Sequence, residues 1–260
     1  MAHYKLILAY DGTDYNGFQR QAIKHSVQAE FETALRKLGW QGRAIMPAGR
    51  TDRGVHAVGQ VISFSLDWKH DDQTLLTALN AHLPAGIAVQ AVYQVEQAFH
   101  PRYDALERTY CYQVYCQKAR NPLLDRYAWH LEHSPDIKLM NQAATQLLGE
   151  HDFRAFGKAL KEDATTVRRI MQAEWVGDTQ RAAFTIGGNA FLYHMVRRIV
   201  YVLVQIGLST LPVDIVRRGL ETGSTGTVSL APARGLTLMR VAYPEDEEEQ
   251  SLSLKHKPCD

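Results

Sequence analysis

The sequence predicts an α+β protein in which a β-α-β-β-α-β pattern occurs twice in tandem. Segments with the alternation of strands and segments with helical spacing follow one another in the same order in residues 1–100 and in residues 101–243. The chain has 260 residues, of which 45% are hydrophobic, and this content is enough for a sizeable core. We therefore expect two similar halves, followed by a tail at residues 244–260.

The first half begins with a predicted strand at residues 4–10, because Tyr4, Leu6 and Leu8 alternate on one face while the other face is also partly apolar. A helix is expected from residue 27, with Ser26 as its N-cap and Gly39 as its end. The remaining expected elements are a short strand at 43–46, a strand that ends near residue 66, a helix over 75–83 and a strand over 87–95.

The second half repeats this order. The expected elements are a strand at 109–116, a helix over 137–147, paired strands at 169–176 and 181–186, a long apolar helix over 190–206 and a final strand at 236–243. A turn at Gly177 and Asp178 joins the paired strands. The pattern is typical of two ferredoxin-like (βαββαβ) halves, and we expect their antiparallel sheets to join edge to edge around a central cleft.

The charge of the chain is unevenly distributed. The net charge is +1, but residues 244–260 carry six acidic residues and two lysines, so residues 1–243 have a net charge of +5. A mildly basic body is compatible with a nucleic-acid partner. The tail contains five consecutive acidic residues and no aromatic residue, which predicts a disordered end.

The cysteines and the hydropathy indicate a cytoplasmic protein. Cys111, Cys116 and Cys259 form neither a disulfide framework nor a metal-ligand spacing, and an odd number of cysteines favours a reducing compartment. We expect no membrane segment, because no apolar run reaches the length of a membrane span, and no signal peptide, because a strand follows Met1.

The segment AGRTDRGVHAVGQVISF (residues 48–64) is the strongest candidate for a functional site. It places Asp52 between Arg50 and Arg53, with a glycine on either side that permits a tight turn. A carboxylate beside two guanidinium groups should stay ionised at neutral pH. Such a group is suited to nucleophilic or electrostatic work.

Three further segments are rich in polar and aromatic residues. Residues 10–21 (YDGTDYNGFQRQ) offer Phe18, Gln19 and Arg20 for contact with RNA. Residues 98–115 (AFHPRYDALERTYCYQVY) include the remaining substrate-binding candidates. They are His100, Arg102 and Arg108. Residues 189–200 (NAFLYHMVRRIV) are expected to be helical, with Phe191 and Met195 on one face and Tyr193 and Arg197 on another.

These segments resemble those of the tRNA pseudouridine synthases that modify the anticodon arm. The sequence is similar to the family patterns GRTDRGVHAVGQVISF, YDGTxYxGFQ, FHPRxDAxxRxYxY and NAFLxxMVR, and APARGLTL at residues 231–238 resembles the closing APAxGLxL strand. The motifs occur in the family's order from Tyr10 to Leu238. Two positions depart from the pattern: Tyr201 stands where the family often has glycine, and Leu230 where it often has threonine.

The resemblance implies an isomerase that converts uridines 38 to 40 of tRNA to pseudouridine after flipping each base out of the stem, without metal or cofactor. It assigns catalytic roles to Asp52, Tyr110 and Arg197. Arg197 is expected to hold Asp52 through a two-pronged contact. Tyr110 would stack on the base and help to remove the C5 proton, and Arg50 would help to keep the base flipped. The family forms homodimers, so we expect a homodimer here.

Some alternatives remain open at this point. Asp52 has three possible roles: attack on ribose C1′, attack on uracil C6, or removal of the C2′ proton. A non-catalytic RNA-binding protein would need the basic and aromatic residues but not Asp52. A hydrolase acting on a glycosidic bond would need a second carboxylate, for which Asp11 and Asp14 are candidates.

Overall fold

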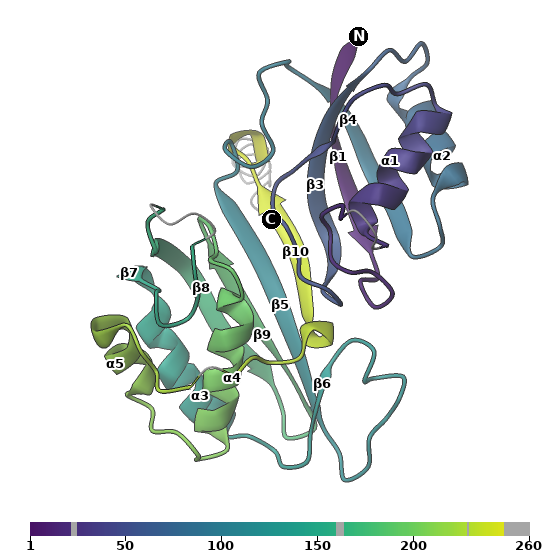
Figure 1. The fold of residues 1–260 in the computed structure, drawn as a ribbon. Helices are drawn as coiled ribbons and strands as arrows, with labels where there is room; N and C mark the ends of the chain where they lie inside the picture. Colours follow the sequence, from purple (N-terminus) through teal and green to yellow (C-terminus); the bar gives the residue numbers. More distant parts are fainter. Residues whose placement is uncertain (22–24, 160–163, 228, 247–260) are drawn as a thin grey trace, which may run out of the picture.

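The described residues form one continuous sheet with helices packed against it (Figure 1). The computed structural model describes residues 1–21, 25–159, 164–227 and 229–246. Ten strands pair in these residues, and all but two of their pairings are antiparallel. The α+β class is therefore confirmed, and the two expected sheets are parts of a single sheet.

The N-terminal elements are close to those expected. They are β1 (Ala2–Tyr10), α1 (Val27–Lys37), β2 (Met46–Pro47), β3 (His56–Leu66), α2 (Asp72–His82) and β4 (Ile87–Val95). The Ser26 side chain caps α1 by accepting a hydrogen bond from the amide of Ala29. Gly39 follows the helix with a φ of +89°, a conformation that favours glycine.

The C-terminal elements include several that the sequence pattern did not predict. The full set is β5 (Glu107–Cys116), β6 (Trp129–Leu131), α3 (Ile137–Ala144), the 3₁₀ helix η1 (Thr145–Leu147), β7 (Gly149–Asp152), β8 (Val167–Gly177), β9 (Arg181–Gly188), α4 (Met195–Gly207), α5 (Ile215–Thr222), the 3₁₀ helix η2 (Ala233–Gly235) and β10 (Leu236–Ala242). The short strands β6 and β7 and the helix α5 were not expected.

Strand β10 joins the two parts of the sheet. The strand order is β4-β1-β3-β10-β5-β9-β8-β7, with β2 beside β3 and β6 beside β5. The last strand of the described chain therefore lies between β3 and β5 (Figure 1). It pairs in parallel with the start of β3, where Thr237 is opposite His56 and Leu238 is opposite Ala57. This pairing fixes the start of β3, and with it the loop that carries Asp52.

The long helix starts later than expected. The periodicity predicted a helix over 190–206, but α4 begins at Met195. His194 has a φ of +64°, and the backbone of Tyr193 pairs with that of Lys158 instead of joining the helix. Phe191 and Tyr193 therefore do not lie on the helix faces that their spacing predicted. The short strand expected at 43–46 is likewise displaced, to Met46–Pro47.

Tyr201 has a packing partner in this protein. Its ring stacks on Trp129 of β6, with the centroids 6.3 Å apart and the planes within 12°. The contact joins α4 to the strand that follows the long β5–β6 connection. Tyr201, which stands where the family pattern often has glycine, therefore adds an aromatic contact at this position.

The start of the predicted tail is ordered. Glu245 accepts a hydrogen bond from the buried Lys5 ammonium at 2.5 Å, and Asp246 accepts one from the amide of Tyr243 at 3.1 Å. The expectation of a disordered tail from residue 244 was therefore wrong for these two residues, and residues 247–260 lie outside the described range. None of the helices within the described residues has both the length and the apolar character that a membrane span needs.

Two truncations should separate these contacts from the rest of the tail. Ending the chain at Asp246 keeps the Lys5–Glu245 pair, whereas ending it at Pro244 leaves the largely buried Lys5 without that carboxylate. Because Glu245 is half exposed, we expect the shorter protein to lose about 1 kcal/mol, or about 2–4 °C in Tm. Thermal unfolding followed by circular dichroism checks this, and equal Tm values for the two truncations would contradict it.

Candidate active site

The loop that carries Asp52 is held on several sides before β3 begins. The carbonyl of Thr51 accepts a hydrogen bond from the amide of Phe18 at 3.1 Å, and its hydroxyl pairs with the Tyr10 hydroxyl at 2.8 Å. The carbonyl of Asp52 accepts the amide of Val55 at 3.2 Å, which closes the turn. Asp52 therefore projects from a constrained backbone. A functional site needs such constraint to keep its geometry.

Glycine is required where the first polar loop approaches this turn. At Gly17, which has a φ of +87°, an added Cβ would lie 2.8 Å from the carbonyl oxygen of Thr51. Gly54 of the turn itself has a φ of +77°. A side chain at Gly17 would both strain the backbone and force the two loops apart.

Arg197 reaches Asp52 from α4, although not through a two-pronged contact. Its Nη1 donates to Oδ2 of Asp52 at 2.9 Å, while its Nε donates to the carbonyl of Ala231 at 2.8 Å. The expected fork onto the carboxylate is therefore corrected. The guanidinium divides its donors between a carboxylate and a backbone carbonyl, which a lysine ammonium on a flexible stem would not do with the same geometry.

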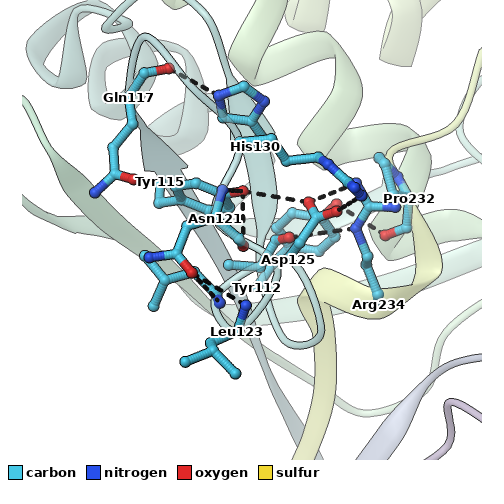
Figure 2. Close-up of polar contacts among 12 residues, drawn as sticks. Tyr112, Tyr115, Gln117, Asn121, Leu123, Asp125, His130, Pro232 and Arg234 are labelled. Carbon is cyan, nitrogen blue, oxygen red and sulfur yellow. Dashed lines mark hydrogen bonds and ion pairs between the residues drawn. The ribbon is translucent and has the colours of Figure 1, made fainter.

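The Ala231 carbonyl is itself held in place. The Tyr112 hydroxyl donates to the adjacent carbonyl of Pro232 at 2.8 Å, and Arg234 pairs with the buried Asp125 at 3.0 Å (Figure 2). The APARGL motif thus supplies a fixed acceptor for Arg197 just before β10.

His194 is a site residue that the sequence analysis missed. Its Nε2 lies 3.3 Å from Oδ2 of Asp52, the same oxygen that Arg197 binds. Within the described residues, no hydrogen bond or ion pair reaches Oδ1 of Asp52. One carboxylate oxygen is therefore held, the other has no such partner among those residues, and Asp52 lines a cavity. The only sequence signal was the position of this histidine inside NAFLYHMVR.

His194 is in an environment that disfavours its charged form. Burial is the largest influence and lowers the pKa of His194, repulsion from Arg197 and Arg198 lowers it further, and attraction to Asp52 raises it in part. The net pKa lies below the usual histidine value, so the ring is neutral at neutral pH. A neutral ring beside Asp52 adds no second positive charge next to that of Arg197.

Tyr110 lines the same cavity from β5. Its ring meets Phe191 edge to face at 5.2 Å and packs against the hydrophobic clusters of both halves of the protein. Burial, followed by repulsion from Tyr10, raises the pKa of Tyr110 well above its usual value. Tyr110 is therefore a neutral phenol at neutral pH.

Arg108 has a structural role. Its guanidinium donates to four backbone carbonyls, which include Ala48 at 3.2 Å, Ala105 at 3.0 Å and Asn189 at 2.8 Å. These carbonyls come from the Asp52 loop, the segment before β5 and the segment before α4. Arg108 was expected to bind substrate, but its donors hold the walls of the cavity together.

The other predicted substrate-binding residues divide into two groups. A cavity of about 880 Å³ is lined by Asp52 and Tyr110 and also by Gln19, Arg50, His100 and Arg102. Arg20 does not line this cavity: its guanidinium pairs with Glu32, whose side chain is fully buried. Arg20 neutralises an interior carboxylate while its side chain stays 42% exposed, and its expected contact with RNA stays a prediction.

Asp52 supplies the one carboxylate that lines this cavity within the described residues. Neither Asp11 nor Asp14 lines it. Asp11 accepts hydrogen bonds from Arg126 at 2.8 Å and Tyr127 at 2.9 Å, so its oxygens are already occupied. Neither candidate from the sequence therefore supplies the second carboxylate that the hydrolase alternative needs. Within the described ranges, no group of three His, Cys, Asp or Glu side chains is placed to hold a metal ion.

Comparison with known proteins identifies relatives over most of the chain. The sequence model of a family described as tRNA pseudouridine synthase matches residues 6–104 and 143–244. A tRNA pseudouridine synthase A from Streptococcus equi subsp. equi is 40% identical, covering 94% of this chain and all of that protein. One from Chloroflexus aurantiacus is 40% identical, covering 92% of this chain and 88% of that protein. A chain from the crystal structure of an archaeal box H/ACA sRNP Nop10-Cbf5 complex has a TM-score of 0.40 and 12% identity, covering 78% of this chain and 44% of that chain.

The contact between His194 and Asp52 can be measured directly by NMR titration of the histidine. Because the Asp52 charge raises the pKa of His194, Asp52→Asn should lower that pKa further below its wild-type value. Arg198→Gln removes a repelling charge and should raise it, which provides a control of opposite sign. A His194 pKa that is the same in the wild type and in Asp52→Asn would show that the two side chains do not interact.

Proposed function

Since the chain belongs to the tRNA pseudouridine synthase family, we propose that its cavity isomerises uridines 38 to 40 in the anticodon arm of tRNA, with Asp52 as the essential carboxylate. As a member of this family the protein is an enzyme that converts uridine to pseudouridine in tRNA. In this reaction the bond from ribose C1′ to N1 breaks and a bond from C1′ to C5 forms. The proton on C5 leaves, and N1 gains one.

The observation that carries the proposal is the asymmetric environment of the Asp52 carboxylate. Oδ2 is bound by Arg197 at 2.9 Å with His194 at 3.3 Å, while Oδ1 has no hydrogen bond or ion pair within the described residues and Asp52 lines the cavity. Arg197 fixes the orientation of the carboxylate through this charge-assisted hydrogen bond. Oδ1 is then the oxygen that acts on the target nucleotide.

The target uridine must leave the stacked stem before Asp52 can reach it. Arg50 is exposed, lines the cavity and is two residues from Asp52, which supports the role of keeping the base flipped. Tyr110 offers its ring to the flipped uracil. Because its pKa is raised, its hydroxyl acts as a neutral group that relays the C5 proton and does not hold a negative charge.

We also propose a fold assignment, a cellular location and an oligomeric state for the whole protein. We assign the two parts to ferredoxin-like halves, since the last strand of each part (β4 or β10) lies beside its first (β1 or β5), and β3 or β9 lies on the other side of that first strand. We propose a cytoplasmic location, which the free thiols of Cys111 and Cys116 support. We also propose a homodimer, as the family resemblance implies.

The competing hypothesis is an RNA-binding protein without catalysis. It is tested by incubating the protein with unmodified tRNA and mapping pseudouridine by carbodiimide modification and primer extension, with mass spectrometry to show that no mass is gained or lost. We expect new pseudouridine at positions 38 to 40 alone. Bound but unchanged tRNA would favour the competing hypothesis, and pseudouridine elsewhere would move the target site.

Asp52→Asn keeps the size of the side chain but removes its charge. We expect a folded protein that retains tRNA binding and forms no detectable pseudouridine, because binding depends largely on phosphate contacts and catalysis on the carboxylate. The side chain of Asp14 is 79% exposed, so Asp14→Asn is the matched control and should retain wild-type turnover. Turnover by Asp52→Asn within tenfold of wild type would remove Asp52 from its catalytic role.

Tyr110→Phe separates stacking from proton transfer. The ring that stacks on the flipped uracil is kept, so binding should be normal, but the hydroxyl that relays the C5 proton is lost. On tRNA tritiated at C5, we expect tritium release to collapse while a C5-linked intermediate accumulates in single-turnover quenches.

Tyr110→Ala completes this comparison. It should also lose the stacking contact, worth about 1–3 kcal/mol, and therefore bind more weakly than Tyr110→Phe. Tritium release by Tyr110→Phe at the wild-type rate would assign the proton transfer to another group and leave Tyr110 as a stacking surface.

A further inference from the structure

We propose that Tyr103 and Tyr193 are stacking platforms for the nucleobases that flank the flipped uridine, and we call this pair the tyrosine platforms. This inference rests on the proposed function and deepens it by naming how the RNA on either side of the target is held. Neither residue was a candidate from the sequence, and neither touches Asp52.

Both tyrosines are exposed where the cavity opens. Their side chains are 75% and 49% exposed respectively, and both line the cavity that contains Asp52. Large aromatic rings gain little by facing water, so two of them at one cavity indicate a surface that a ligand covers. The cavity volume of about 880 Å³ lies near the upper end of the range of about 300–1,000 Å³ for small-ligand pockets, which leaves room beyond one flipped base.

Tyr193 is separated from the reacting carboxylate by one ring. It stacks on His194 with the centroids 3.6 Å apart and the planes 26° apart, and Nε2 of His194 lies 3.3 Å from Asp52. Its backbone is paired in both directions with Lys158, so the ring is carried by a fixed segment. A base stacked on Tyr193 would therefore be an immediate neighbour of the target.

Tyr103 is supported in a similar way on another wall of the cavity. Its ring lies against His100 with the centroids 4.3 Å apart and the planes 34° apart. Nδ1 of His100 accepts hydrogen bonds from the amides of Arg102 and Tyr103, and the amide of His100 donates to Asp104 at 2.8 Å. This arrangement orders the ring before RNA binds, which lowers the entropic cost of stacking.

The charges beside Tyr103 indicate a nucleotide as the ligand. The Arg102 guanidinium lies 5.8 Å from the Tyr103 ring centroid. This guanidinium can bind the backbone phosphate of a nucleotide whose base stacks on the ring.

The test uses the Asp52→Asn protein, so that binding is measured without turnover. The probe is an unmodified anticodon-arm hairpin with 2-aminopurine placed on one side or the other of the target uridine. We expect Tyr103→Ala and Tyr193→Ala each to weaken binding about 5- to 150-fold and to abolish the fluorescence quenching at one neighbour. The corresponding phenylalanine variants keep the ring and should bind within about twofold of the parent.

Tyr93 provides the matched control, because it is 48% exposed on β4 and does not line the cavity. Tyr93→Ala should leave affinity and quenching unchanged. If Tyr103→Ala and Tyr193→Ala behave like Tyr93→Ala, the platforms are overturned while the proposed function stands. A parent protein that does not bind the hairpin would overturn both proposals.

Discussion

The guanidinium of Arg197 binds two oxygens from distant parts of the chain, and the geometry of the site depends on this contact. It donates to Asp52 in the loop before β3 and to the carbonyl of Ala231 before β10. The backbone of Ala231 returns the contact, because its amide donates to the carbonyl of Arg197 at 3.1 Å. One side chain of α4 therefore joins the Asp52 loop of the first half to the closing segment of the second, and Oδ1 of Asp52 has no hydrogen bond or ion pair within the described residues.

The sheet makes this contact possible. Because β10 pairs with both β3 and β5, the segment before β10 is brought next to the start of β3. His56 at that start accepts the amide of Gly12 through Nδ1, and its Nε2 lies 3.1 Å from the carbonyl of Arg234. The start of β3 thus brings together the first polar loop, the Asp52 loop and the APARGL segment. This explains how motifs spread from Tyr10 to Leu238 come to lie around a single cavity.

Sequence patterns predicted those elements whose formation depends mainly on neighbouring residues. Alternation and helical spacing located β4 and α2, and the charged turn pointed to Asp52. Tertiary contacts decided the rest. Helix α4 begins later than predicted because Tyr193 pairs with Lys158 and His194 has a left-handed backbone conformation. Hydrophobic periodicity does not show either of these features. Arg108 and Arg20 are basic residues of the kind that binds RNA. In the folded protein Arg108 binds backbone carbonyls and Arg20 binds the buried Glu32, and only folding brings these partners together.

The measurement that tests this account most directly is the single-turnover rate of pseudouridine formation by Arg197→Lys, with Arg198→Lys as the matched control one residue along the same helix. Lysine keeps the charge but cannot hold Asp52 and the Ala231 carbonyl in the same geometry. We predict a rate about 10- to 150-fold lower, since a hydrogen bond to a charged group contributes about 1.5–3 kcal/mol, with tRNA affinity and Tm near those of the wild type. Arg198→Lys should stay close to the wild-type rate. Equal rates for the two variants would contradict the central role of the Arg197 contact.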